Sequence, residues 1–205
     1  SQMEIYDGNQ WTGILATSSK QETGGTRGLM GGGSAPGVTN AIDFINVDTT
    51  GNSSDFGDLS YARRGVAALA SRTRGVFAGG RSSDNNGIDF VTIASTGNAA
   101  DFGDLTITSH HGTGISDGTR GIITAMENSS WTNNNSNRID FITIASTGNA
   151  NDFGDLYQGT RETGGCESKT RGIVFGGSPN GLNVIQYFTI STGGNSADFG
   201  DVSAV

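Results

Sequence analysis

The sequence predicts an all-β fold built from four copies of one unit, and three observations lead to that prediction. The tripeptide TRG recurs at intervals of 47, 46 and 51 residues, starting at Thr26, Thr73, Thr119 and Thr170. An apolar run typical of a β-strand follows each TRG, starting at Ile42, Ile88, Ile139 and Ile185. No segment keeps an apolar period of 3.6 residues, so helices should be nearly absent. Repeats at this spacing indicate a fold in which one small unit is stacked on the next.

Each unit contains four short predicted strands, which are clearest in the second copy. They cover residues 65–71, 75–80 and 88–94, with a shorter fourth strand within 100–106. The turns between them are clusters of Asn, Gly, Asp and Ser, as expected of tight reversals. The distance from each of the first three isoleucines to the next TRG is always 31 residues, whereas the distance from TRG to that isoleucine varies from 15 to 20. The connection between the second and third strands is therefore predicted to be a surface loop.

The third strand of each unit indicates how the units are arranged. In the second copy Ile88 and Phe90 share one face while Val91 lies on the other, so both faces of the strand are predicted to be buried. A small sheet with two buried faces must lie between similar sheets, as the blades of a propeller do. We therefore predict an all-β β-propeller of four blades, each with four antiparallel strands. A ring that closes within one chain is the simplest form, and a ring completed by another chain is the alternative.

The predicted domain boundaries follow from the repeats. The propeller covers residues 14–205, with blades at about 14–60, 61–106, 107–157 and 158–205. Residues 1–13 precede the first unit, and the segment MEIYDGNQW at 3–11 has the pattern of two short strands joined by a turn. We expect an N-terminal β-hairpin extension that docks on the first blade.

Composition and charge exclude several classes of partner. The chain has 205 residues, a formal net charge of −8 and only two lysines, Lys20 and Lys169, so no surface is suited to follow a nucleic acid backbone. The single cysteine, Cys166, cannot form an internal disulfide, and we expect it to fill a first-strand position as a small apolar group. The apolar stretch at 65–70 is far too short to span a bilayer. We therefore predict neither nucleic acid binding nor membrane insertion.

The most strongly repeated phrase, DFGD, is predicted to be structural. Its phenylalanine should fill the space between blades, its glycine should bend the backbone, and its aspartates should cap turns or form ion pairs. The alternative is a calcium site, but the alternating carboxylates of a calcium loop are missing. The TRG arginines recur once per blade, and we hypothesise that they pair with these aspartates. The predicted structural residues are Arg27, Arg74, Arg120, Arg171, Phe56, Phe102, Phe153, Phe199, Asp58, Asp104, Asp155 and Asp201.

Residues suited to catalysis are few. The only histidines, His110 and His111, are adjacent and lie in a different unit from Cys166, so the sequence pairs no nucleophile with a base. Two histidines alone do not make a closed zinc site. We therefore predict no enzymatic activity, no cofactor and no bound metal.

The third copy departs from the others at one loop. Its loop at 126–138 is five residues longer than that of the second copy, and strand order puts it on the same side of the ring as the histidines. A Trp with Asn and His neighbours suits stacking on a sugar or contact with a protein. The candidate ligand-binding residues are Trp131, Asn133, Asn134, Asn135, His110 and His111. The alternative is a longer loop whose Trp packs against its own blade.

Two resemblances suggest a function. A strand that ends in a glycine pair, such as VFAGG at 76–80, followed by an Ile-rich strand and a short last strand, resembles the kelch repeat. Kelch blades usually have a Trp in the last strand, where this chain has the Phe of DFGDL. The wording TRGVFAGG at 73–80 with IDFVTIASTGNAADFGDL at 88–105 is similar to repeats in virion proteins of marine bacteriophages, particularly those of cyanobacteria.

The second resemblance implies a bacteriophage virion structural protein, either a surface decoration or a part of a tail or fibre. Its partners would be other virion proteins of the capsid or tail, a host surface glycan, or further copies of itself. Its location would be the surface or the tail of the phage particle. The alternative is a free lectin-like propeller module that binds carbohydrate or protein.

Overall fold

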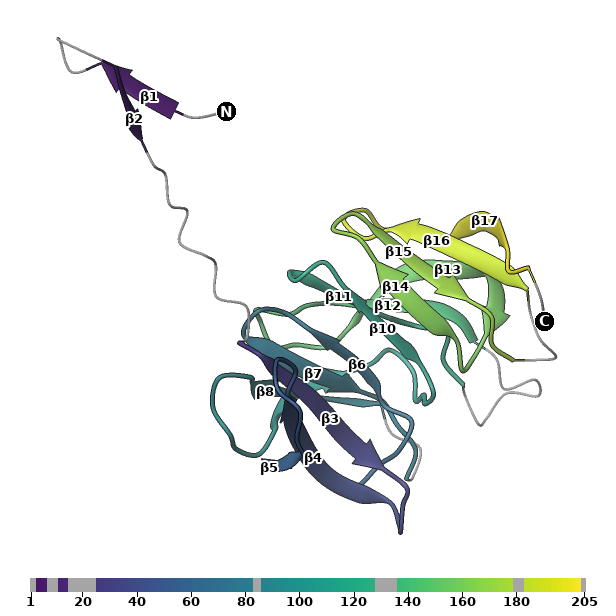
Figure 1. Ribbon diagram of the computed structural model, residues 1–205. Helices are drawn as coiled ribbons and strands as arrows, with labels where there is room; N and C mark the ends of the chain where they lie inside the picture. The colour runs from purple at the N-terminus through teal and green to yellow at the C-terminus, as the bar shows by residue number, and fades with distance from the viewer. Residues whose placement is uncertain are drawn as a thin grey trace.

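The fold consists of β-strands throughout the part of the chain that the structure describes (Figure 1). The computed structural model describes the backbone of residues 3–6 and 11–14, and residues 25–82, 86–127, 136–178 and 183–203 in full. Over these ranges no helix is long and apolar enough to cross a membrane.

The N-terminal strands form the predicted hairpin. Strand β1 (Met3–Tyr6) pairs with β2 (Trp11–Ile14) in an antiparallel ladder, with Met3 opposite Ile14. The hairpin extension is thereby confirmed. The predicted docking of this hairpin on the first blade would involve its side chains, which lie outside the described residues.

Four antiparallel sheets follow, and in each the strands are neighbours in chain order. The first sheet contains β3 (Arg27–Gly33), β4 (Thr39–Asn46) and β5 (Ser54–Asp58). The second contains β6 (Ala67–Ala70), β7 (Arg74–Ala78), β8 (Gly87–Thr92) and β9 (Ala100–Asp104). The third contains β10 (Thr113–Ser116), β11 (Arg120–Thr124), β12 (Ser136–Thr143) and β13 (Asn151–Thr160). The fourth contains β14 (Gly164–Glu167), β15 (Arg171–Phe175), β16 (Val184–Thr189) and β17 (Ala197–Asp201).

These sheets confirm the all-β, blade-like architecture that the repeats predict. The strands of the second sheet fall where the second copy predicted them, within a residue or two at each end. The first sheet differs, because it has three strands among the described residues where the other sheets have four.

The glycine of DFGD bends the last strand of each sheet, as predicted. The ladder between the third and fourth strands shifts register at the pair opposite this glycine, for example between Ile88 and Asp89 in the second sheet. The glycine itself has a φ that side chains rarely adopt, 142° at Gly103. A bulge with a left-handed glycine therefore recurs at the same place in every blade.

The four sheets are stacked in chain order, with the first and fourth at the two ends of the row (Figure 1). Strand β10 lies next to both β6 and β14, so the first strands of successive blades are neighbours. Three apolar clusters fill the stack. One lies mainly between the first and second sheets, one between the second and third, and one between the third and fourth. Both faces of the inner sheets are therefore buried, as the apolar pattern of the third strand predicted, and together they form the core.

Cys166 corrects one prediction. It lies on β14, the first strand of the fourth sheet, as expected, but it is exposed instead of filling an apolar position. All four residues of β14 are exposed, because this strand belongs to the last sheet of the row.

Candidate functional site

Antiparallel strands place the connections of each sheet at two opposite ends. The turn end carries the turn between the first two strands and the STGN turn, which in the second sheet are residues 71–73 and 93–99. The link end carries the segments that join one sheet to the next, residues 59–66, 105–112 and 157–163, the last of which includes the end of β13. The two ends use different residues and are described in turn.

At the turn end each of the first three TRG arginines reaches the following sheet. Nη1 donates a hydrogen bond of 2.8, 2.8 or 2.9 Å to a carbonyl oxygen, in the pairs Arg27 to Ile93, Arg74 to Ile144 and Arg120 to Ile190. All four guanidinium groups also lie over an aromatic ring of their own sheet, as Arg74 does at 4.4 Å from the centre of Phe90. The predicted pairing with the DFGD aspartates is wrong, because the packing of one sheet on the next brings a backbone carbonyl, and not a carboxylate, to the guanidinium.

The DFGD phenylalanines fill the space between blades, as predicted, at the three junctions that the chain makes. Phe56, Phe102 and Phe153 are buried, and each packs edge-on against the aromatic ring of its neighbouring strand. Phe199 of the fourth sheet is exposed. The filler role therefore holds for three of the four repeats.

The two DFGD aspartates have separate structural roles. The first caps the turn, since Oδ1 of Asp101 accepts a hydrogen bond from Gly103 N at 3.1 Å, and Asp152 and Asp198 do the same in their sheets. The second joins sheets through its backbone amide, which donates to an asparagine Oδ1 of the next STGN turn. These bonds of 3.1, 3.1 and 3.0 Å join Asp58 to Asn98, Asp104 to Asn149 and Asp155 to Asn195.

At the link end the two histidines meet a glutamate. Glu127 Oε2 lies 3.0 Å from His111 Nδ1, within hydrogen-bond distance, and 3.4 Å from His110 Nε2. The backbones of His110 and Glu127 form an isolated β-bridge, which places the histidine link beside the start of the loop at 126–138. The start of that loop thus lies on the histidine side, as predicted. We call His110, His111 and Glu127 the histidine cluster.

The backbone at the histidine cluster explains a glycine in the preceding link. Gly65, His111 and Glu162 occupy equivalent positions and have left-handed φ values of 63°, 54° and 55°. His111 N donates to Gly65 O at 2.7 Å, and Glu162 N donates to His111 O at 3.3 Å. A Cβ at position 65 would lie 2.2 Å from the His111 ring, so only glycine fits beneath it. His111 thus adopts a conformation that disfavours side chains, at a position where the second sheet has glycine.

Basic side chains determine the charge of Glu127. Burial alone would raise the pKa of this carboxyl, but the hydrogen bond from His111 and the positive charges of His110 and Arg161 outweigh burial and hold the pKa below its ordinary value. Arg161 Nη1 lies 3.8 Å from Glu127 Oε1, and Glu162 Oε1 lies 3.7 Å from His111 Nδ1. The cluster is therefore a small network of alternating charge.

The donor set of the cluster resembles that of a transition-metal site. One atom from each of His110, His111 and Glu127 lies within 4.8 Å of the others. Two imidazoles and a carboxylate suit a divalent ion such as zinc. The guanidinium of Arg161 beside the same carboxylate competes with a cation, so we interpret the cluster as a hydrogen-bonded ion-pair network.

Sequence reasoning found part of this site. It selected both histidines, which the structure brings together with Glu127, but it missed Glu127, Arg161 and Glu162. The available signal was the position of Glu127 at the start of the long loop and the alignment of Arg161 and Glu162 with the histidine pair. The remaining candidates, Trp131, Asn133, Asn134 and Asn135, lie outside the described residues.

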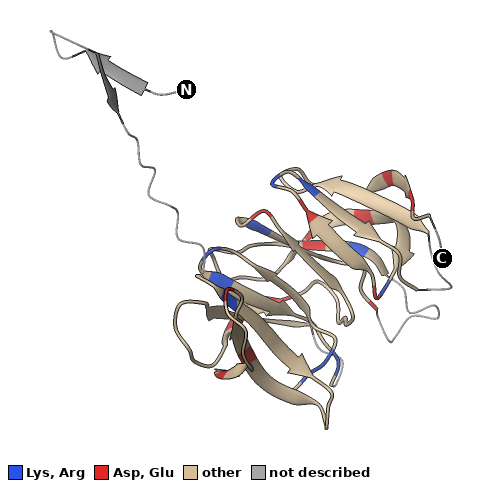
Figure 2. Ribbon diagram, in the orientation of Figure 1, with Lys and Arg blue, Asp and Glu red and all other residues tan. Residues whose placement is uncertain are grey.

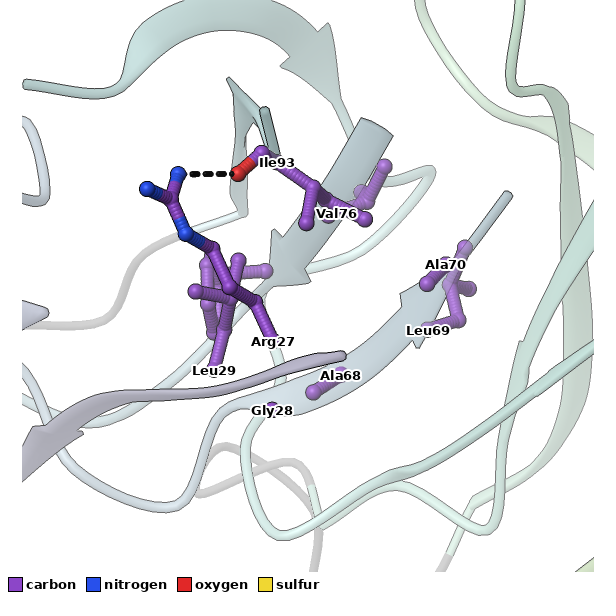
Figure 3. Close-up of a pocket in the computed structure, with 10 residues that line it drawn as sticks. Arg27, Gly28, Leu29, Ala68, Leu69, Ala70, Val76 and Ile93 are labelled. Atoms are coloured by element: carbon purple, nitrogen blue, oxygen red, sulfur yellow. Dashed lines mark hydrogen bonds between the residues drawn. The ribbon is translucent and has the colours of Figure 1, made fainter. Parts of the chain in front are cut away.

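An apolar cavity of about 310 Å³ lies between the first and second sheets (Figure 3). It is bounded by the start of β3, by β6 and by β7, with Arg27 pointing across it to the Ile93 carbonyl. In the junction between the second and third sheets, β6 pairs with β7 and occupies the corresponding space. Leu69 of β6 reaches the position that a Cβ of Gly121 would take. We therefore interpret this cavity as the position of a first strand, and not as a ligand site.

A second, polar hollow of about 490 Å³ lies at the turn end. Turn residues of three successive sheets surround it, namely Ser71, Arg72, Thr73, Asp117, Gly118, Thr119, Ala145 and Lys169. Hydroxyl groups, a carboxylate and two basic side chains thus face one space of the size that small ligands occupy.

Comparison with known proteins adds no family to these observations. No protein-family model matches the chain, and no curated protein matches it either.

Proposed function

We propose that this chain is a non-enzymatic structural protein of a bacteriophage particle, a surface decoration or a part of the tail or fibre, that serves as a rigid binding platform. The observation that carries the proposal is the use of the repeated polar residues. Among the described residues, the TRG arginines of the first three sheets donate to carbonyl oxygens of the next sheet, and the first DFGD aspartates of the last three sheets cap turns. The repeats therefore supply a scaffold, and the residues that differ between blades supply recognition.

Recognition is assigned to the link end of the third sheet. There the histidine cluster, Arg161 and the start of the loop at 126–138 come together, and no other blade repeats these side chains. Figure 2 shows acidic and basic segments scattered over all four sheets, which favours a protein or glycan partner over a strongly charged polymer. Resemblance of the repeat wording to phage virion proteins supports the particle as the setting.

A second candidate is a free lectin-like module, and the polar hollow at the turn end favours it. Sugar hydroxyl groups are bound by the hydroxyl, carboxylate and basic groups that face this space, such as Thr73, Asp117 and Lys169. In this case the turn end, and not the histidine cluster, would hold the ligand.

Mass spectrometry and antibody labelling of purified phage particles test the first proposal. We expect the chain to be a stoichiometric component that antibodies reach on the particle surface or tail. Its absence from washed particles that contain the other structural proteins would remove this proposal.

A glycan array separates the two binding sites. If a sugar is bound, Trp131→Ala and His111→Ala should abolish binding under the first proposal, whereas Lys169→Ala and Arg72→Ala should do so for the lectin-like module. Tyr157→Ser, a change of an exposed side chain that belongs to neither the histidine cluster nor the polar hollow, is the control that should bind as the wild type does.

A further inference from the structure

The three junctions between successive sheets are built from the same set of bonds. At each one a glycine amide of the STGN turn donates to the carbonyl of the preceding DFGD phenylalanine at 2.7 Å, in the pairs Gly97 to Phe56, Gly148 to Phe102 and Gly194 to Phe153. The arginine-to-carbonyl and aspartate-to-asparagine bonds accompany it each time. We name the two sides of a junction after the arginine bond. The sheet with the TRG arginine and the DFGD strand presents the donor half, and the next sheet, with the STGN turn and the end of its third strand, presents the acceptor half.

The fourth sheet repeats the donor half, and there it is exposed. Phe199 is 52% exposed, against 3% for its equivalent Phe102. Arg171 is exposed, although its guanidinium lies over the Tyr187 ring as the other arginines lie over theirs. A Cβ at Gly200 would touch nothing within 4 Å, whereas one at Gly103 would lie 2.5 Å from the backbone of the following sheet.

The first sheet repeats the acceptor half, which is also exposed. Val47 is 63% exposed, whereas its equivalent Ile144, whose carbonyl receives Arg74, is 0% exposed. In the turn, Ser53 is exposed, whereas its equivalent Ala150 is buried. In the row of sheets this face and the face of the fourth sheet lie at opposite ends (Figure 1).

A link-end bond extends the correspondence. Ser60 donates through its amide and hydroxyl to Asp89 of the next sheet at 2.9 and 2.8 Å, and Thr106 donates to Asp140 in the same way. The equivalent donor in the fourth sheet is Ser203, which is exposed, and the equivalent acceptor in the first sheet is Asp43. Both ends of the strands therefore carry one half of a junction on each outer sheet.

We propose that these two faces are an interface between copies of this chain, in which the fourth sheet of one copy packs on the first sheet of a second copy as a fourth junction. Phe199 then fills the space between the two copies, the Arg171 guanidinium reaches the Val47 carbonyl, and Asp201 binds Asn52. The occupant is a second copy because each chain carries both halves, already shaped by the three junctions within it. The proposal does not depend on the role in a phage particle.

Such an interface is heterologous, since two different surfaces meet. Two or more copies joined in this way form a closed ring if the rotation per sheet completes a circle, and an open filament if it does not. The exposed apolar residues at the two ends, Phe199 and Val47, are covered in either case.

Cross-linking tests the predicted register. Asn52→Cys and Asp201→Cys are made in separate chains that also carry Cys166→Ser, because Cys166 is exposed. Under a mild copper oxidant the mixture should give a disulfide-linked dimer that contains one chain of each kind, at a yield several-fold above that of either variant alone. No excess of the mixed dimer would overturn the proposal. A disulfide within a single chain carrying both cysteines, at monomer mass, would also overturn it, because the ring would then close on itself.

Solution mass provides the second measurement. Light scattering on the wild type should give a mass above that of one chain that rises with concentration, and Phe199→Asp and Val47→Asp should each reduce it to one chain. Tyr157→Asp, which changes another exposed aromatic residue, should leave the wild-type mass unchanged. Circular dichroism confirms that each variant is folded. A wild-type mass of one chain at all concentrations, or variants that assemble as the wild type does, would contradict the interface.

Discussion

The turn end and the link end of the sheets differ in how strictly the repeats are kept. At the turn end the glycine, arginine and asparagine bonds recur at every junction with nearly the same lengths. At the link end the equivalent residues of successive links differ, as Arg63, Ser109 and Thr160 do, and so do Gly65, His111 and Glu162. The comparison teaches that repetition marks the joints of this fold, whereas individual sheets acquire their own chemistry where the repeat is relaxed.

The largest expected loss of stability comes from a residue of the link end, Arg63, which shows that a position that is not repeated can also join parts of the fold. Arg63 is fully buried, and its Nη2 lies 2.8 Å from Asp89 Oδ2. Its Nη1 also donates to the Gly87 carbonyl at 3.0 Å, and the guanidinium stacks on Tyr61. Arg63→Ala leaves the Asp89 carboxylate buried beside an empty space, so we expect a loss of about 3–5 kcal/mol of unfolding free energy.

Chemical denaturation measures this loss, and the adjacent residue is the control. Arg64 is exposed, so Arg64→Ala should change the unfolding free energy by less than about 0.5 kcal/mol. Equal effects of the two substitutions would mean that the buried ion pair does not hold the second sheet to its link.

A pair of glycines tests the turn-end joint. Gly103 and Gly200 have nearly the same φ, 142° and 137°, so alanine causes the same backbone strain at both. Only at Gly103 would the new Cβ collide, at 2.5 Å from the Gly148 carbonyl oxygen. Gly103→Ala should therefore cost roughly 1–3 kcal/mol more than Gly200→Ala in thermal or denaturant unfolding of the monomer. Equal costs would indicate that the sheets do not approach at this joint in solution.

The sequence predicts the features that repeat and fails where a contact joins distant segments. Local spacing, repeated in four copies, predicts the strand positions, the bulge at the DFGD glycine and the buried DFGD phenylalanines. The predicted partner of the TRG arginines was wrong because every residue has a backbone carbonyl, so the sequence does not indicate which one accepts the hydrogen bond. Glu127 and Arg161 were missed because they come from two other segments, which only the stacked sheets bring to the histidines. The exposure of Phe199 depends on what lies beside the fourth sheet, which no repeat specifies.

His111 offers a smaller test at the link end. His111→Ala removes the hydrogen bond to Glu127 and keeps a side chain at a φ of 54°, whereas His111→Gly removes the same bond and relieves the left-handed strain. The glycine variant should thus be more stable than the alanine variant by about 1 kcal/mol. Thermal unfolding of the two variants provides the measurement. The same comparison at Glu162, where φ is 55°, should give the same sign, and a more stable alanine at either position would contradict the left-handed assignment.

The smallest expected effect is the pH dependence that the histidine cluster adds. The pKa of Glu127 is lower in the folded chain than its ordinary value of 4.5, because the basic groups around it outweigh its burial. A lowered carboxyl pKa stabilises the fold above the unfolded pKa, and this stabilisation is lost as the pH falls through the folded pKa. The stability difference between wild type and Glu127→Gln should therefore shrink as the pH is lowered from about 5 toward 3. Denaturant unfolding at a series of pH values tests this, with Asp48→Gln, an exposed change far from the cluster, as the control. A difference that stays constant down to pH 3 would show that the histidines and Arg161 do not hold this carboxylate in its charged form.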